Sequence, residues 1–236
     1  MKVDKRISAK RGDWSFGDNI AESFQQHIER SIPLYHEGHE VICQLSDFFA
    51  LPDSLVYELG CSTGKLLRCL AEHNGHKKNI RWIGLDKEEE MVQFAQQANA
   101  DKTDMEFYCA DISNYEYETA DMIVAYYTLQ FVEERQRQYL INTIYEKLNW
   151  GGAFIMFEKV GAPDARFQDM MSCLYREFKQ GRGFTPDEVA NKEASLKGIL
   201  KPFSSQGNAD LLRRAGFTDV MTVMKYVAFE GFLAIK

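Results

Sequence analysis

Residues 56–64 constrain the fold more than any other stretch of the chain. Their first half is apolar and β-prone, and Gly60 and Gly64 then bracket a run of small residues. From Lys65 onward, apolar side chains recur at helical spacing. This order predicts a strand, a tight turn and a helix. In an open α/β sheet, ligands bind beside such a turn because it lies at the carboxyl end of a strand.

Two acidic residues indicate which kind of ligand the turn binds. Asp86 ends the next predicted strand, about 20 residues past the turn, where an acid binds ribose hydroxyls. Its alternative role is to cap the following helix, residues 88–98. Glu58 precedes the turn, where its charge would repel a pyrophosphate and favour a cationic ligand. Because Ser62 also replaces a glycine that dinucleotide-binding turns require, the sequence favours S-adenosyl-L-methionine.

The segments around this turn resemble the class I methyltransferases. The resemblance covers about residues 50–236 and implies S-adenosyl-L-methionine as the cofactor. It is carried by Glu58-x-Gly60-x-Ser62-x-Gly64, Gly84-Leu85-Asp86, Cys109-Ala110-Asp111-Ile112, Lys147-Leu148-Asn149-Trp150-Gly151-Gly152 and Leu211-Leu212-Arg213-Arg214-Ala215-Gly216-Phe217.

Strands and helices alternate from residue 55 onward, which predicts an α/β fold in a single domain, residues 1–236. We expect a Rossmann-like, seven-stranded methyltransferase sheet with helices on both faces. Residues 1–50 are expected to form an N-terminal helical cap or lid, and residues 160–203 a two-helix insert. A final strand pair should close the sheet as an antiparallel edge. The predicted strands are 55–59, 80–86, 105–110, 122–127, 153–159, 218–227 and 231–236.

A narrower resemblance runs nearly from end to end. The segments that carry it are similar to the carboxy-S-adenosylmethionine synthases, which act in bacterial modification of the tRNA wobble uridine. Those enzymes convert S-adenosylmethionine and prephenate into carboxy-S-adenosylmethionine and phenylpyruvate. The segments are Gly12-Asp13-Trp14, Glu29-Arg30-Ser31-Ile32-Pro33-x-Tyr35, Thr128-Leu129-Gln130-Phe131, Phe157-Glu158-Lys159 and Phe178-Lys179.

This resemblance implies a set of residues that line the cofactor. They are Tyr35, Gly60, Cys61, Ser62, Asp86, Lys87, Asp111 and Ile112. The pattern of the turn adds Glu58 and Gly64 to the predicted cofactor site, and the end of the fourth predicted strand adds Tyr126. For Asp111, recognition of an adenine edge and a turn cap are both open.

Two positions depart from the synthase pattern. Tyr126 stands where that family has an asparagine, and Lys192-Glu193 stands where it has a lysine and an arginine. That arginine holds the added carboxylate, whereas a glutamate would repel it by ~4 kcal/mol at ~4 Å and an effective dielectric of 20. We therefore expect a methyltransferase that acts on a small-molecule acceptor. The alternatives are the carboxy-S-adenosylmethionine synthase itself and a non-catalytic cofactor-binding partner of another enzyme.

Three residues are candidate catalytic bases for such a methyl transfer: Tyr126, His36 and Glu193. Because strand residues alternate between faces, only one of Tyr126 and Tyr127 should point into the site, and the asparagine correspondence favours Tyr126. His36 and His39 have the spacing of metal ligands. They lie in a polar, exposed-looking stretch without a third ligand, so no metal is expected.

Composition narrows the partners and the compartment. The net charge of −7 argues against nucleic-acid binding, and no apolar run is long enough to span a membrane. The five cysteines form no C-x-x-C, which favours a reduced, cytoplasmic protein. A small-molecule substrate and a homodimer are the expected partners. The dimer is predicted from one apolar helix side in the insert, formed by Phe167, Met170, Met171, Leu174 and Phe178.

Overall fold

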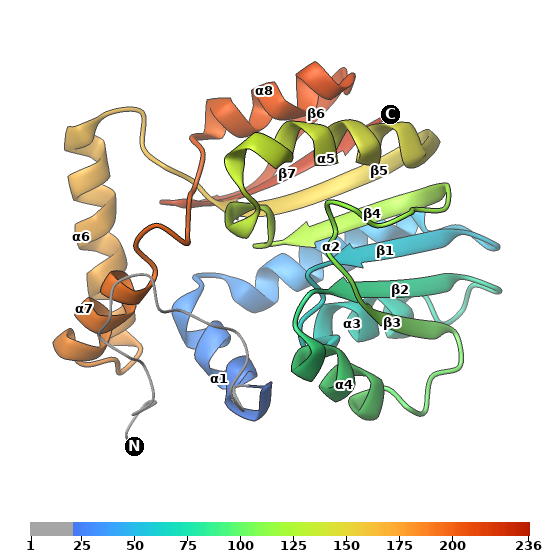
Figure 1. Ribbon diagram of the computed structural model, residues 1–236, viewed down its shortest axis with the longest axis horizontal. Helices are drawn as coiled ribbons and strands as arrows, with labels where there is room; N and C mark the ends of the chain where they lie inside the picture. Colours follow the sequence, from blue (N-terminus) through green and yellow to red (C-terminus); the bar gives the residue numbers. More distant parts are fainter. Residues whose placement is uncertain (1–20) are drawn as a thin grey trace.

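A seven-stranded sheet forms the centre of the protein (Figure 1). The computed structural model describes residues 21–236, so the segment with Trp14, and the part of the expected N-terminal cap that precedes residue 21, lie outside the described residues. The strands lie in the order β3-β2-β1-β4-β5-β7-β6. Their bounds are β1 (Leu55–Leu59), β2 (Arg81–Asp86), β3 (Met105–Cys109), β4 (Ala120–Tyr126), β5 (Leu148–Lys159), β6 (Asp219–Tyr226) and β7 (Phe229–Ile235).

The predicted seven-stranded α/β sheet is confirmed, with one refinement at its C-terminal end. Strands β3, β2, β1, β4 and β5 are parallel. The antiparallel strand is β7, which pairs with both β5 and β6. It therefore lies inside the sheet, and β6 forms the edge.

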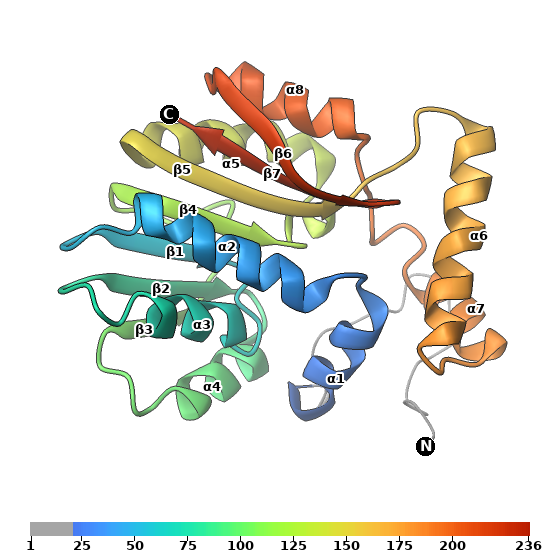
Figure 2. The ribbon, with the colours of Figure 1, turned by 180° about the vertical axis from the view of Figure 1, so that it is seen from behind.

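Helices cover both faces of the sheet, as expected. α2 (Tyr35–Phe49), α3 (Lys65–His73) and α4 (Glu89–Ala98) pack on one face. α5 (Glu134–Lys147) and α8 (Ser205–Ala215) pack on the other face. Figures 1 and 2 show these two layers from opposite sides. Since α2 lies along the sheet, this half of the expected N-terminal cap is part of the body of the domain.

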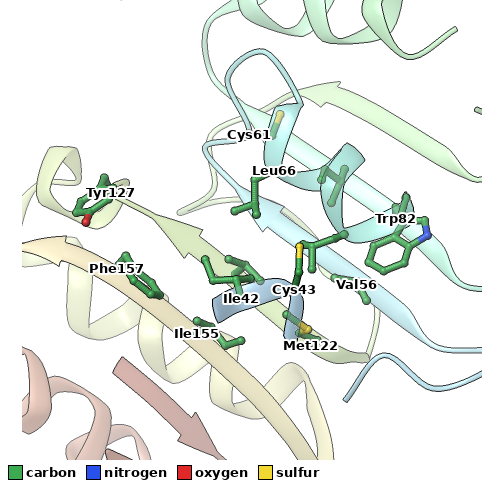
Figure 3. Packing of buried hydrophobic residues seen from close by; sticks show 14 of the residues in the cluster. Ile42, Cys43, Val56, Cys61, Leu66, Trp82, Met122, Tyr127, Ile155 and Phe157 are labelled. Atoms are coloured by element: carbon green, nitrogen blue, oxygen red, sulfur yellow. The ribbon is translucent and has the colours of Figure 1, made fainter. Parts of the chain in front are cut away.

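Two buried apolar clusters, one on each face, hold the layers together. Every residue of β1 is buried, as expected of a central parallel strand. Because side chains alternate along a strand, Val56 and Tyr57 belong to opposite clusters. Figure 3 shows Val56, Trp82 and Met122 packed around Ile42 and Cys43 of α2. The α2 helix is thereby fixed to the sheet.

The predicted two-helix insert projects beyond the carboxyl ends of the parallel strands, next to α1 (Ala21–Ser31) (Figures 1 and 2). It consists of α6 (Ala165–Gly181) and α7 (Pro186–Ser195). The start of α7 matches its sequence signals: Thr185 and Glu188 form a capping box and Pro186 occupies the first turn. No helix among residues 21–236 is long and apolar enough to cross a membrane.

The packing of α2 on the sheet predicts a strong effect of truncating Ile42, whose side chain is 0% exposed. Ile42→Ala should lower the free energy of unfolding by about 2–5 kcal/mol, because a cavity replaces the buried side chain. The matched control is Phe48→Ala on the same helix, where the side chain is 73% exposed. That variant should stay within about 0.5 kcal/mol of wild type in urea unfolding. Equal effects of the two substitutions would contradict the described packing.

Candidate functional site

A cavity of about 680 Å³ opens where the parallel strands end, between the sheet, α1, α6 and α7. Its walls include the turn after β1, the ends of β2 and β4, and the insert. All predicted cofactor and catalytic residues except Gly64 and His36 line it. Those that do are Tyr35, Glu58, Gly60, Cys61, Ser62, Asp86, Lys87, Asp111, Ile112, Tyr126 and Glu193.

The glycine turn adopts a conformation that larger residues would not tolerate. Gly60 has φ +71°, and a Cβ there would lie 2.5 Å from the side chain of Thr128. Gly64 has φ +75°, and its Cβ would lie 2.8 Å from the Phe107 ring. Both positions therefore require glycine. Gly64 shapes the turn from outside the cavity, where β3 packs against it.

Asp86 joins the turn to the end of β2. Its two carboxylate oxygens accept hydrogen bonds from the backbone N–H of Ser62, at 2.8 Å, and of Glu88, at 3.0 Å. Burial raises the pKa of this carboxyl group. Each carboxylate oxygen has a second lone pair, so Asp86 keeps acceptor capacity for the hydroxyls of a ribose.

Glu58 is fully enclosed beneath the turn. It is 3% exposed, and its Oε2 accepts a hydrogen bond from Leu67 N, near the start of α3, at 3.0 Å. Burial raises the pKa of Glu58 well above its ordinary value, and the charge of Asp86 raises it further. A cation bound in the cavity would favour the ionised form of both acids.

Asp111 and Ile112 lie after β3 on the same side of the cavity. Asp111 accepts hydrogen bonds from Ser113 N at 2.8 Å and from the Asn114 side chain at 3.3 Å. Both bonds belong to a turn, so the capping role is present in the structure. Asp111 also lines the cavity, which leaves recognition of a ligand as a prediction.

Two tyrosines lie where β4 ends, Tyr126 as the last residue of the strand and Tyr127 just past it, and both line the cavity. The Tyr126 hydroxyl donates to the carbonyl of Tyr35 at 2.7 Å, and burial raises the pKa of Tyr126. Tyr126 is therefore poorly placed to accept a proton from a substrate. The expectation that only one tyrosine faces the site is wrong. Tyr127 lies just past the strand with φ +61°, so the alternation that governs strands does not extend to it.

The two histidines at the start of α2 have opposite surroundings. His36 points out of the cavity, with its side chain 57% exposed and its Nε2 3.7 Å from Glu29 Oε2. His39, expected to be exposed, is 5% exposed and lines the cavity, and burial lowers its pKa to about 3. The described residues contain no group of three or more potential metal ligands.

Glu193 lies in the insert wall and is held by a cation. The Arg176 guanidinium donates to both oxygens of its carboxylate, at distances of 3.0, 3.2 and 3.1 Å. α6 supplies Arg176 and α7 supplies Glu193, so this pair joins the two helices of the insert. No pattern in the sequence indicates that Arg176, 17 positions away, pairs with Glu193.

Two lysines near this pair were not predicted as site residues. The ammonium groups of Lys159 and Lys179 lie 4.5 and 4.3 Å from the centroid of the Tyr175 ring. Lys179 is 4% exposed, and burial lowers its pKa to about 8. Burial also lowers the pKa of Lys159. Each lysine belongs to a segment that carried the family resemblance, which was the available signal for their role.

These acids and lysines lie toward different ends of the cavity. Glu58, Asp86 and Asp111 lie at the ends of β1, β2 and β3, where the more exposed Lys65 and Lys87 also line the wall, whereas Lys159 and Lys179 lie beside the insert. The acidic end suits a ligand with a sulfonium and an ammonium group. The basic end suits an anion.

Comparisons with known proteins show the family of this chain. A family described as methyltransferase domain matches residues 56–152. Carboxy-S-adenosyl-L-methionine synthase of Staphylococcus epidermidis is 35% identical over 224 residues, which cover 94% of this chain and 97% of that protein. The synthase of Actinobacillus succinogenes is 36% identical over 242 residues, covering 100% of both chains.

Solved structures share the fold at lower identity. A putative methyltransferase of Haloferax volcanii, in complex with the Trm112 activator, has a TM-score of 0.63 at 16% identity and covers 94% of this chain and 99% of that chain. Human N-acetylserotonin methyltransferase in complex with S-adenosylmethionine has a TM-score of 0.61 at 17% identity, covering 92% of this chain and 55% of that chain. The chain is thus an S-adenosyl-L-methionine-dependent enzyme of the class I methyltransferase fold, and it belongs to the carboxy-S-adenosyl-L-methionine synthase family.

Proposed function

We propose that this protein synthesises carboxy-S-adenosyl-L-methionine from S-adenosyl-L-methionine and an anionic carboxyl donor, prephenate. The observation that carries the proposal is a pair of lysines, the half-buried Lys159 and the buried Lys179, at the insert end of the cavity. The cofactor end and the lysine end lie in one continuous cavity, so both substrates could be held together.

The lysine pair calls for an anionic ligand. Neither ammonium group forms a salt bridge with an acid in the described part of the chain. Glu193 lies close enough to raise the pKa of both, but its carboxylate is bound to Arg176. Moving two positive charges out of water is unfavourable when no negative charge is bound beside them. A bound carboxylate would supply the missing negative charge.

The pairing of Glu193 with Arg176 weakens the main argument against this reaction. An isolated glutamate would repel the added carboxylate, as the sequence suggests. Because Arg176 binds both oxygens of Glu193, the pair carries little net charge toward the cavity. Lys159 and Lys179 then contribute a positive electrostatic potential at this end of the cavity.

The protein would act mainly by positioning the reactants. Carboxylation replaces one hydrogen of the cofactor methyl group by a carboxyl group, so a proton must leave. Tyr126 donates its hydroxyl to a carbonyl, His36 lies outside the cavity and Glu193 is ion-paired, so none of the three predicted catalytic residues is placed as a base. Conversion of prephenate to phenylpyruvate releases a carboxyl group and a hydroxide, and that hydroxide can take the proton as water. The main contribution of the protein would then be to align the two bound reactants, which can lower the activation barrier by up to about 7–11 kcal/mol.

A second candidate function is methyl transfer to an anionic small molecule. Glu193 favours it, because this cavity residue stands where the synthase pattern has an arginine. The lysine pair would then hold the acceptor. Consumption of S-adenosyl-L-methionine without prephenate, by a co-purified acceptor, would distinguish this function from carboxylation.

We also propose that the whole chain, residues 1–236, works as one domain in the cytoplasm, with residues 1–50 and 160–203 completing the site. All five cysteines are free thiols, as expected in a reducing compartment. The net charge of −7 and the size of the cavity, about 680 Å³, favour a small-molecule substrate over nucleic acid.

A homodimer through α6 completes the proposal. Phe167, Met170 and Leu174 are 43, 54 and 51% exposed on this helix. Met171, which the sequence placed on the same side, instead packs against the core and lines the cavity. The exposed apolar side chains of α6 would be covered by a second copy.

Asp86→Ala and Gly60→Val should each weaken S-adenosyl-L-methionine binding at least ~10-fold, or about 1.4 kcal/mol, in isothermal titration calorimetry. The first substitution removes the acceptor at the ribose position, and the second places methyl groups where Thr128 and the ligand lie. The control is Asp101→Ala, an exposed acid paired with Arg68 outside the cavity, which should bind as wild type. Wild-type affinity in both site variants would refute this cofactor site.

Prephenate and S-adenosyl-L-methionine should together yield the carboxylated cofactor and phenylpyruvate, detected by mass spectrometry. Lys179→Met should raise the KM for prephenate roughly 10- to 100-fold, because hydrogen bonds to charged groups contribute about 1.5–3 kcal/mol. Prephenate binding should also weaken as pH rises through about 8, where Lys179 loses its proton. Lys78→Met, at an exposed position outside the cavity, is the control. An unchanged KM in Lys179→Met would contradict the role of the lysine pair.

Light scattering of the protein at micromolar concentration should give about twice the chain mass of 27.2 kDa. Leu174→Lys should give a folded monomer, because this side chain is already half-exposed in the single chain. Trp150→Lys, at a side chain 87% exposed elsewhere, should remain a dimer. A monomeric wild-type protein would refute the proposed interface.

A further inference from the structure

Tyr127 combines two unfavourable features within the cavity wall. Its backbone has φ +61°, a region that non-glycine residues rarely adopt. Its side chain is 6% exposed, and its hydroxyl has no hydrogen-bond partner among residues 21–236. Such features persist only where the surroundings enforce them, and they concentrate at functional sites.

Hydrogen bonds on both sides fix this conformation. Tyr127 N donates to Phe157 O at 2.7 Å, and the Gln130 amide donates to Tyr127 O at 3.0 Å. The other atom of the Gln130 amide, Oε1, accepts from Lys159 N at 3.1 Å. Gln130 therefore couples the position of Tyr127 to that of Lys159.

Two aromatic rings, Phe229 and Tyr175, connect Tyr127 to the lysine pair. Its ring lies 5.8 Å from that of Phe229, and Phe229 lies 5.2 Å from Tyr175, the ring that both lysines contact. Figure 3 shows Tyr127 at one end of the apolar cluster, away from the aliphatic side chains around Ile42. Its hydroxyl therefore ends the apolar cluster at the cavity wall, which Tyr127 lines together with Gln130 and Lys159.

We propose that the Tyr127 hydroxyl is a specificity-determining hydrogen-bond donor to the carboxylate-bearing substrate that Lys159 and Lys179 hold. The substrate class rests on the proposed function, whereas the unpartnered hydroxyl does not. Burial raises the pKa of Tyr127, so the hydroxyl keeps its proton and donates. The adjacent tyrosine has a different task, because the Tyr126 hydroxyl is already bound to the Tyr35 carbonyl.

The test is Tyr127→Phe, which removes only the hydroxyl. With S-adenosyl-L-methionine present, calorimetric titration should show roughly 10- to 100-fold weaker binding of phenylpyruvate and a matching rise in the KM for prephenate. The affinity for S-adenosyl-L-methionine should not change. The midpoint of urea unfolding should stay the same or rise, because no hydrogen bond within the protein is lost.

Tyr57→Phe is the matched control. This fully buried hydroxyl lies outside the cavity and accepts a hydrogen bond from Glu118 N at 3.2 Å. Its removal should lower the unfolding midpoint and leave both affinities unchanged. If wild type binds phenylpyruvate and Tyr127→Phe binds it equally well, the role of Tyr127 is overturned and the proposed function stands. If wild type binds neither phenylpyruvate nor prephenate, the role of Tyr127 and the proposed function are both overturned.

Discussion

The site depends on the attachment of the glycine turn to the end of β2. Asp86 accepts the N–H of Ser62, while the N–H groups of Gly60 and Cys61 both donate to the carbonyl of Leu85, at 2.7 and 2.9 Å. These bonds hold the turn in its left-handed conformation and leave the carboxylate of Asp86 at the cavity. The same turn begins α3, whose third amide is held by Glu58. The ligand end of the sheet is therefore ordered by hydrogen bonds within the protein before any ligand binds.

The opposite end of the cavity is ordered by charge. The pair of Arg176 and Glu193 joins α6 to α7, whereas the half-buried Lys159 and the buried Lys179 form no salt bridge within residues 21–236. Taken together, one end favours a cation and the other an anion. This division explains how one cavity could hold a sulfonium cofactor and a carboxylate donor in different places, since each ligand would be disfavoured in the position of the other.

The sequence predicted the sheet, and it predicted which turn residues and acids gather at one end of the cavity, because these signals are local. The turn residues and Asp86 follow strand ends, and the chemistry of those positions can be read from spacing. Glu193 of the insert was predicted to face the cavity, but its ion pair was not, because Glu193 meets Arg176 only through helix packing. Tyr127 was missed for another reason: a positive φ places it outside the alternation that holds within β4. The burial of His39 likewise depends on how α2 lies against the sheet.

The central claim is that the cofactor lies at the acidic end of the cavity and a carboxylate lies at the lysine end. A crystal structure with S-adenosyl-L-methionine and phenylpyruvate tests this directly. The ribose hydroxyls should lie at Asp86 and the carboxylate of phenylpyruvate at Lys159 and Lys179, with the Tyr127 hydroxyl within hydrogen-bond distance of the same ligand. A carboxylate bound away from both lysines, with the lysine end empty, would contradict this arrangement.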